Sequence, residues 1–412
     1  MHTTLSMVKR NCIDRTFAFI ESLSIGDRTL LKGMLVLCVA SVAWLLISLN
    51  ALALVGIPAR GGTIREGIVG TPRFINPVLA VTTADQDMVA LIYAGLMTLG
   101  TDGALVPAIA DSVTISEDGR MYDVVLRQDV TFHDGTSLSA DDVLFTVSRI
   151  QDPAVKSPLR ARWEGVTANR LSDRELQFVL PEPYAPFIEN LTLGILPKHI
   201  WERVSAEELP FSAYNNEPVG AGPYIVDTVT RNVSGIPETY ELSANSEYFK
   251  SRPKIKTLVL TFYPNEEALT DAFVGGAIST AGGLSRESIE HIRSAGIPYT
   301  LATTPLPRTF ALFFNQNQFP LFRDNAVRRA LEKAVDREEL VTEVLGGYGE
   351  QTPSPIPPEF GIDLPSASAQ DNIGRLEGAR TILDEGGWKI NENTGLWEKK
   401  DGKETQTLSF TV

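Results

Sequence analysis

The side chains that could carry out catalysis or hold a metal ion are few and widely spaced. The chain of 412 residues has four histidines, His2, His133, His199 and His291, and no two of them have the spacing of metal ligands. We therefore expect no zinc or nickel site built from protein side chains. His133 and His199 are expected to be hydrogen-bonded parts of the scaffold.

Other signatures of catalysis are also missing. Asp141 and Asp142 are adjacent, so on a helix their side chains point about 100° apart and cannot form a catalytic pair. The sequence has no G-x-S-x-G nucleophile elbow and no G-x-x-x-x-G-K-[ST] phosphate loop, and Gly220-Ala-Gly222 is too short for a dinucleotide fingerprint. A hydrolase is disfavoured because the histidines supply no nucleophile–base pair. We expect no catalytic residues and no cofactor.

One segment predicts a strand, a tight turn and a helix in succession. Tyr122, Val124 and Leu126 alternate as on a half-buried strand. Asp134-Gly135 predicts a turn, because glycine accepts positive φ without steric cost. A helix follows, with Ser139 as its N-cap and Asp142 three residues later, as in a capping box.

This segment resembles the signature of a known family, the extracytoplasmic solute-binding proteins of family 5, which serve peptide and nickel ABC importers. The signature is F-x-D-G-x-x-x-x-A-x-D-V, here Phe132 to Val143. Further blocks of the family agree in order over residues 61–412. They are Gly61-Gly-Thr-Ile-Arg-Glu66, Ile195-Leu-Pro-Lys-His-Ile200, Val219-Gly-Ala-Gly-Pro-Tyr-Ile225, Phe313-Phe-Asn315, Asp324 to Leu331, Ala334 to Arg337, and Ala379 to Trp388.

The resemblance implies an α/β fold of the periplasmic-binding-protein type II class, with two lobes joined by hinge strands. Residues 61–92 and 201–304 would form lobe I, residues 93–200 an inserted strand-rich subdomain, and residues 305–412 a partial lobe II. Relatives continue well past the Gly386-Gly-Trp388 block, so lobe II is expected to be incomplete. The chain is then either a fragment or a degenerate form.

Periodicity and end signals predict the individual elements. Strands are expected at 61–70, 224–230, 238–243, 257–263 and 408–412, and helices at 84–99, 265–273, 285–292, 324–345 (restarting at Asp336) and 376–385.

The N-terminal part predicts a membrane segment. No charged residue occurs from Gly33 to Ala59, which is long enough for a helix to cross a bilayer core of about 30 Å. Basic residues precede it, so residues 1–32 are expected in the cytoplasm and the rest outside. An uncleaved signal-anchor at 33–58 is favoured over a cleaved signal peptide, although Ala51-Leu-Ala53 could serve as a cleavage site. Cys12 and Cys38 precede the exported part, which therefore has no disulfide.

The net charge of −14 argues against nucleic acid as a partner. The resemblance implies instead a monomer that captures short peptides by hinge closure and passes them to a permease with ATPase subunits. By position in the family, the expected ligand-binding residues are Val81, Thr82, Thr83, Tyr224, Phe314 and Asn315. Other solutes (a nickel chelate, haem or an oligosaccharide) and a non-transport surface receptor remain as alternatives.

Overall fold

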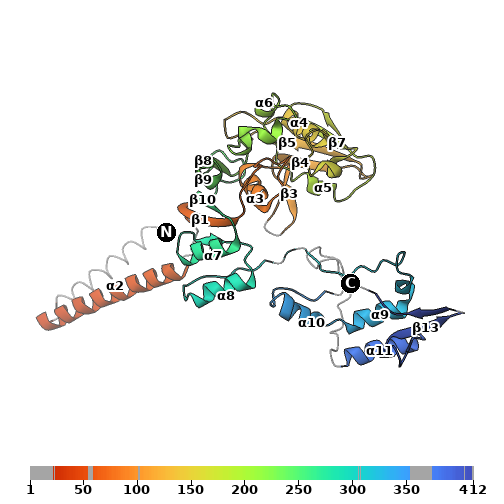
Figure 1. The fold of residues 1–412 in the computed structure, drawn as a ribbon. Coiled ribbons are helices and arrows are strands. Elements are labelled where there is room, and N and C mark those ends of the chain that lie inside the picture. Colours follow the sequence, from red (N-terminus) through yellow and green to blue (C-terminus); the bar gives the residue numbers. More distant parts are fainter. Residues whose placement is uncertain are drawn as a thin grey trace, which may run out of the picture. The chain divides into compact units, whose positions relative to one another are not determined.

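A computed structural model of the chain describes residues 22, 24–53, 59–100, 103–304, 306, 308–352, 374–402 and 404–410. The chain divides into two compact units, Met1–Gly282 and Gly283–Val412. Figure 1 shows the elements of both units. The predicted lobe boundaries do not follow from this division and stay predictions.

The N-terminal helix α2, Ile25–Ala53, is long and apolar. Its segment Ile25–Ser48 is long and apolar enough to cross a membrane, and its apolar window is not buried. Arg28 and Lys32 lie in its first turns. The sequence therefore predicted a helix here correctly, while its role as an anchor stays a prediction.

A mixed five-stranded sheet forms one layer of the first unit, in the order β11-β1-β10-β9-β8. The strands are β1 (Gly61–Val69), β8 (Tyr224–Arg231), β9 (Pro237–Ala244), β10 (Ile255–Tyr263) and β11 (Thr280–Ala281). β1 is parallel to both neighbours, and β8, β9 and β10 pair antiparallel. The predicted strands at 61–70, 224–230, 238–243 and 257–263 are confirmed.

Helix α7 (Glu266–Val274) packs closely on this sheet at Gly67. A Cβ atom at Gly67 would lie 2.2 Å from Leu269 Cδ1 and 2.5 Å from Ile278 Cδ1, so any side chain larger than hydrogen would push α7 away. Asn265 caps α7 by accepting a hydrogen bond from the Ala268 N–H at 2.9 Å, which explains why the helix begins there.

A second, antiparallel sheet has the order β4-β5-β7-β6. It consists of β4 (Ala110–Ile115), β5 (Met121–Leu126), β6 (Thr167–Arg170) and β7 (Glu175–Val179), and it is preceded by a β2–β3 hairpin (Met97–Leu99, Leu105–Pro107). Burial alternates along β5 as the sequence predicted. Helix α4 (Ala140–Gln151) follows the Asp134-Gly135 turn, and short helices α5 (Phe187–Asn190) and α6 (Lys198–Trp201) come after β7.

The helix predicted at 84–99 is wrong at its C-terminal end. Helix α3 spans Thr83–Ile92, and Tyr93 is already extended. The chain leaves the helix because Gly95 packs against another backbone segment, where a Cβ would lie 2.4 Å from the Thr192 carbonyl oxygen. The N–H of Met97 donates to the Leu191 carbonyl at 2.9 Å, and β2 begins there.

The second unit contains helices and a small three-stranded sheet. The helices are α8 (Arg286–Ser294), α9 (Asn325–Ala334), α10 (Arg337–Glu339) with a π-helical turn (Leu340–Val344), and α11 (Arg375–Glu385). Asp336 restarts the chain as α10 by accepting from the Glu339 N–H at 2.9 Å, as predicted. The antiparallel strands β12 (Lys389–Ile390), β13 (Trp397–Asp401) and β14 (Glu404–Thr407) were not predicted, and the strand expected at 408–412 is not formed over residues 408–410.

Asp324 joins three elements of this unit. Its Oδ1 accepts from the Ala326 N–H at 2.9 Å and caps α9. Its Oδ2 accepts from Trp388 Nε1 at 3.0 Å and from Lys399 Nζ, on β13, at 2.7 Å. Partial burial acts to raise the pKa of Asp324, but these donors together hold it below its ordinary value. The ionised form is therefore the one that the fold stabilises.

Replacing Asp324 should destabilise the second unit. We expect Asp324→Ala to lower its free energy of unfolding by about 2 kcal/mol, since a helix cap and two side-chain bonds are lost. Asp324→Asn keeps the helix cap and should therefore lose less unfolding free energy than Asp324→Ala. Because the pKa is lowered in the folded state, the contribution is present at neutral pH and disappears as the pH falls below about 4. Denaturant unfolding followed by tryptophan fluorescence measures both effects.

Lys389→Ala is the matched control, because the Lys389–Asp384 pair is exposed and such pairs contribute about 0–1 kcal/mol. Equal losses of unfolding free energy for Asp324→Ala and Lys389→Ala would contradict the stabilising role of the Asp324 hydrogen bonds.

Candidate ligand-binding site

A buried carboxylate organises the segment between β1 and α3. Asp85 is 1% exposed and lies in the first turn of α3. Its Oδ1 accepts hydrogen bonds from the N–H groups of Arg73 at 2.7 Å and Phe74 at 2.9 Å. Its Oδ2 accepts from the N–H groups of Thr82 at 3.1 Å and Val81 at 3.4 Å. One side chain therefore holds both ends of residues 73–82, called here the 73–82 loop.

The middle of the 73–82 loop is fixed by buried polar groups from distant parts of the sequence. Asn76 accepts from the Val78 N–H at 2.9 Å and donates through Nδ2 to Asn215 Oδ1 at 3.2 Å. The Ile75 N–H donates to the Asn215 carbonyl at 2.9 Å, and Ser157 Oγ donates to the Val78 carbonyl at 2.7 Å. Leaving such a group buried and unpaired costs about 1–3 kcal/mol, so the network favours one conformation of the loop.

Three of the predicted ligand residues follow at the end of this loop. Val81 is 63% exposed, and Thr82 and Thr83 are exposed as well. The Thr82 hydroxyl accepts from the Asp85 N–H at 3.1 Å, which completes a capping box at the start of α3. The Val81 side chain and Thr83 are exposed to solvent, and contact of the three residues with a ligand stays a prediction.

The surface beside α3 is acidic. Burial raises the pKa of Glu66, on β1, and the negative charge of Asp87, on α3, raises it further. Burial also raises the pKa of Asp87. Neither carboxylate was predicted as a site residue, because the two lie far apart in the chain and only the fold brings them within electrostatic range.

Tyr224 is also in the first unit, but it is buried. It begins β8 and is 7% exposed, and its hydroxyl donates to the Ile255 carbonyl at 3.2 Å. Burial raises its pKa. The side chain thus joins the ends of β8 and β10, and its predicted contact with a ligand stays a prediction.

Phe314 and Asn315 belong to the second unit, where both have structural contacts. The Phe314 ring packs on Phe322 with 5.0 Å between centroids. Asn315 Oδ1 accepts from the N–H groups of Asn317 and Gln318, each at 3.1 Å, and forms a turn. These roles were missed by the sequence analysis, and ligand binding by either residue stays a prediction.

The two histidines expected in the scaffold are hydrogen-bonded there, as predicted. His133 bonds through both ring nitrogens to the backbone of residues 220–222, and His199 Nε2 lies 2.6 Å from Asp134 Oδ2. Within the described part of the chain, no group of three or more His, Cys, Asp or Glu residues could hold a metal ion.

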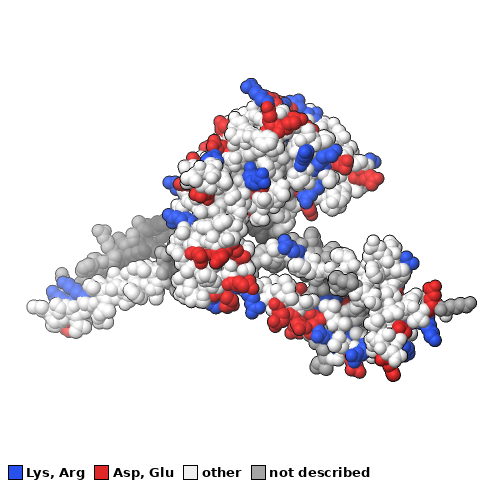
Figure 2. All heavy atoms as spheres, viewed as in Figure 1, with Lys and Arg blue, Asp and Glu red and all other residues white. Residues whose placement is uncertain are grey.

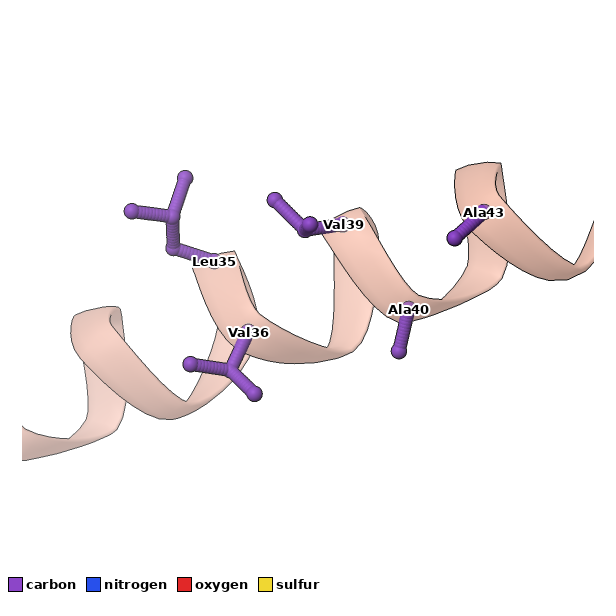
Figure 3. A pocket seen from close by; sticks show the side chains of 5 residues that line it. All are labelled: Leu35, Val36, Val39, Ala40 and Ala43. Carbon is purple, nitrogen blue, oxygen red and sulfur yellow. The ribbon is translucent and has the colours of Figure 1, made fainter.

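Surface hollows and charge add little to the site. The face in Figure 2 carries acidic side chains over α7 and α10 and no continuous basic patch, in keeping with the net charge. One hollow lies on α2 alone, lined by five aliphatic side chains that point outward from the helix: Leu35, Val36, Val39, Ala40 and Ala43 (Figure 3). It is a feature of the apolar helix and contains no polar group that could orient a solute.

Comparison with known proteins decides the family. Residues 104–411 match the family model described as bacterial extracellular solute-binding proteins, family 5. The chain belongs to this family.

Several relatives have names or structures that report a ligand. The oligopeptide-binding protein AppA of Bacillus subtilis is 29% identical over 366 residues, which are 87% of this chain and 64% of that protein. Its structure with a nonapeptide has a TM-score of 0.57 at 26% identity, covering 84% of this chain and 68% of the other. The structure of NikZ of Campylobacter jejuni in complex with Ni(L-His) has a TM-score of 0.61 at 27% identity. The match covers 82% of this chain and 65% of the NikZ chain.

This family member spans less than two thirds of the length of the AppA protein that it matches. The α/β fold with its five-stranded and four-stranded sheets agrees with the binding-protein structures. The family consists of solute-binding proteins rather than enzymes, and this fits the lack of an enzyme signature in the sequence.

Substitution of Asp85 should loosen the 73–82 loop. We expect Asp85→Asn to lose about 1–3 kcal/mol of stability, because an amide cannot accept four hydrogen bonds and its NH₂ group would face backbone donors. Hydrogen exchange at the amides of Arg73, Phe74, Val81 and Thr82 should accelerate most. Asp87→Asn, two residues further along α3, removes a repulsion instead of a bond and should leave these amides protected. Unchanged exchange in Asp85→Asn would contradict this assignment.

Proposed function

We propose that the chain is the substrate-binding component of an ABC importer and captures short peptides outside the cytoplasmic membrane. The observation that carries the proposal is the family match over residues 104–411, together with a relative whose structure holds a nonapeptide. The 73–82 loop supports it, because a rigid loop with exposed Val81 and Thr83 loses little conformational entropy when a ligand binds.

Capture would proceed by hinge closure of two lobes. Lobe I would comprise residues 61–92 and 201–304, with 93–200 as an inserted subdomain, and residues 305–412 would contribute to lobe II. A peptide held as an added strand would gain affinity from main-chain contacts, while Val81, Thr82, Thr83, Tyr224, Phe314 and Asn315 would line the cleft. A permease with ATPase subunits would then receive the ligand, and the binding protein would be a monomer.

The helix α2 would hold the protein at the outer face of the cytoplasmic membrane. Its apolar length and the basic residues Arg28 and Lys32 at its start support an uncleaved anchor with its N-terminus inside. Only seven residues, 54–60, separate α2 from β1 (61 − 53 − 1 = 7), so the sheet could lie no more than about 25 Å from the end of the helix.

A nickel chelate is the second candidate solute, because a structure similar to this one holds Ni(L-His). The described residues offer no metal ligands of their own, so nickel would have to arrive with a carrier that supplies its ligands, as a small chelate does.

Peptides should stabilise the purified full chain. In detergent, we expect a nonapeptide pool to raise the melting temperature in a concentration-dependent way, because a ligand bound to the folded state stabilises it by mass action. Ni(L-His) and haem serve as competing probes. A shift with Ni(L-His) and none with peptides would favour the chelate, and no shift with any probe would contradict solute binding by this chain.

Val81→Asp should weaken peptide binding by about tenfold or more, equivalent to about 1.4 kcal/mol, since it adds a charge to an apolar contact. The melting temperature without ligand should stay within a degree or two of the original, because Val81 is exposed. Val233→Asp, fully exposed between β8 and β9, is the control and should bind normally. Calorimetric titration separates the two variants, and equal affinities would remove Val81 from the site.

An uncleaved anchor predicts that the protein isolated from membranes retains its N-terminus. Mass spectrometry of the intact protein should give the mass of the chain from Met1. A mature protein that begins after Ala53 and leaves the membrane in high salt would show a cleaved signal peptide instead.

A further inference from the structure

A single imidazole connects two parts of the first unit. His133 lies in the hairpin of residues 131–137, which connects β5 of the four-stranded sheet to α4. Residues 220–222 lie directly before β8 of the five-stranded sheet. The N–H of Gly220 donates to His133 Nδ1 at 3.3 Å, and His133 Nε2 lies 3.1 Å from the Gly222 carbonyl oxygen. The main chain adds a third bond, from the His133 N–H to the Gly220 carbonyl at 2.8 Å.

These contacts require one protonation state. Because the Gly220 N–H donates to Nδ1, that nitrogen carries no proton, and Nε2 must hold the ring proton that is donated to Gly222. The imidazole is therefore neutral in this arrangement. A second proton would sit on Nδ1 against the Gly220 N–H, and two donors would face each other.

The segment that receives the imidazole has no room to adjust. A Cβ on Gly220 would lie 2.0 Å from the Ile92 carbonyl oxygen, and one on Gly222 would lie 2.5 Å from the Ile92 carbonyl carbon. The Gly222 N–H donates to the same Ile92 carbonyl at 2.8 Å, and its own carbonyl also accepts from Asn245 Nδ2 at 3.1 Å. The hairpin, the end of α3 and the start of β8 therefore meet at His133.

Few charges act on the imidazole. Asp134, its neighbour in the hairpin, favours protonation, but Asp134 is itself bonded to His199 of α6. Residues 220–223 and 88–93 contribute no charged side chain, and Tyr93 and Asn245 are neutral. Burial lowers the pKa of His133 and outweighs two effects that raise it, the hydrogen bond to the Gly222 carbonyl and the negative charge of Asp134.

We propose that His133 makes the junction between the four-stranded and the five-stranded sheet sensitive to pH. When the solution is acidified, the added proton on Nδ1 opposes the Gly220 N–H and opens that hydrogen bond, while each sheet keeps its own hydrogen bonds. A protein outside the cytoplasmic membrane meets the pH of its surroundings directly, so the junction would loosen in acid without any other signal. This inference is independent of which solute the protein binds.

The sign follows from linkage between protonation and opening. The open junction exposes an imidazole with an ordinary pKa of about 6.5, and the closed junction lowers that pKa. The closed junction is therefore fully stabilised above about pH 6.5. This stabilisation is lost as the pH falls toward the lowered pKa of His133 in the closed junction. Within this window the protection of the junction should fall by up to about tenfold per pH unit.

Hydrogen exchange on the full chain in detergent micelles tests the proposal. Between pH 7.5 and 5.0, protection factors corrected for intrinsic exchange should fall at the amides of Phe132, Leu138 and Gly220. Amides that pair β9 with β10 should keep their protection. His133→Gln should abolish the pH dependence, since the glutamine amide can donate and accept but does not titrate. His199→Gln removes the other nearby imidazole, and this variant should keep the pH dependence of the original chain.

The proposal is overturned if His133→Gln and the original chain show the same pH dependence, or if all amides lose protection together. Should His133→Gln not fold, ¹³C-labelled histidine in the original chain gives the answer by NMR. The chain should give four histidine ring signals, and the one that disappears in His133→Asn belongs to His133. That signal should titrate with a pKa below the ordinary histidine value of about 6.5. Titration of that signal at or above pH 6.5 would overturn the proposal as well.

Discussion

The carboxylate of Asp85 fixes the loop on which the proposed binding surface depends. It is buried at the N-terminal end of α3, where the helix dipole favours a negative charge, and it collects N–H groups from both ends of the 73–82 loop. Without it, these donors would be partly buried and unpaired. The loop lies between strand β1 and α3, so its conformation also determines how α3 meets the sheet. The same side chain thus stabilises the loop and fixes the backbone at Val81 and Thr82, where peptide contacts are proposed.

The other end of α3 is constrained in a different way. Asp85 constrains the N-terminal end of α3, whereas close backbone packing constrains its C-terminal end. Gly220 and Gly222 approach the Ile92 carbonyl so closely that no side chain fits. His133 adds the polar part of this junction. The F-x-D-G segment has a physical role at three of its positions in this protein. Phe132 is buried, His133 joins the hairpin to the five-stranded sheet, and Gly135 makes the turn with φ of 85°.

The sequence predicted most elements of the first unit, since their signals are local. Alternation along β5 and the cap at Asn265 depend on residues a few positions apart. The end of α3 was missed because the cause, Thr192 against Gly95, is about a hundred residues away. Strand β13 was missed because Trp-Glu-Lys-Lys-Asp has no apolar alternation, although Gly395 and Gly402 at its ends were available signals. At the candidate site, position in the family indicated Val81 to Thr83, but the T-x-x-D pattern that reveals Asp85 was not used. Tyr224 and Phe314 were chosen by position alone, and their burial and packing could be known only from the fold.

The central claim is that the surface held by Asp85 receives a peptide. The most direct measurement is photo-crosslinking of a nonapeptide carrying a benzoylphenylalanine to the full chain, followed by mapping of the adduct by mass spectrometry. The account predicts an adduct within residues 73–83 that unlabelled peptide suppresses. An adduct confined to other parts of the chain, or one that unlabelled peptide does not suppress, would contradict it.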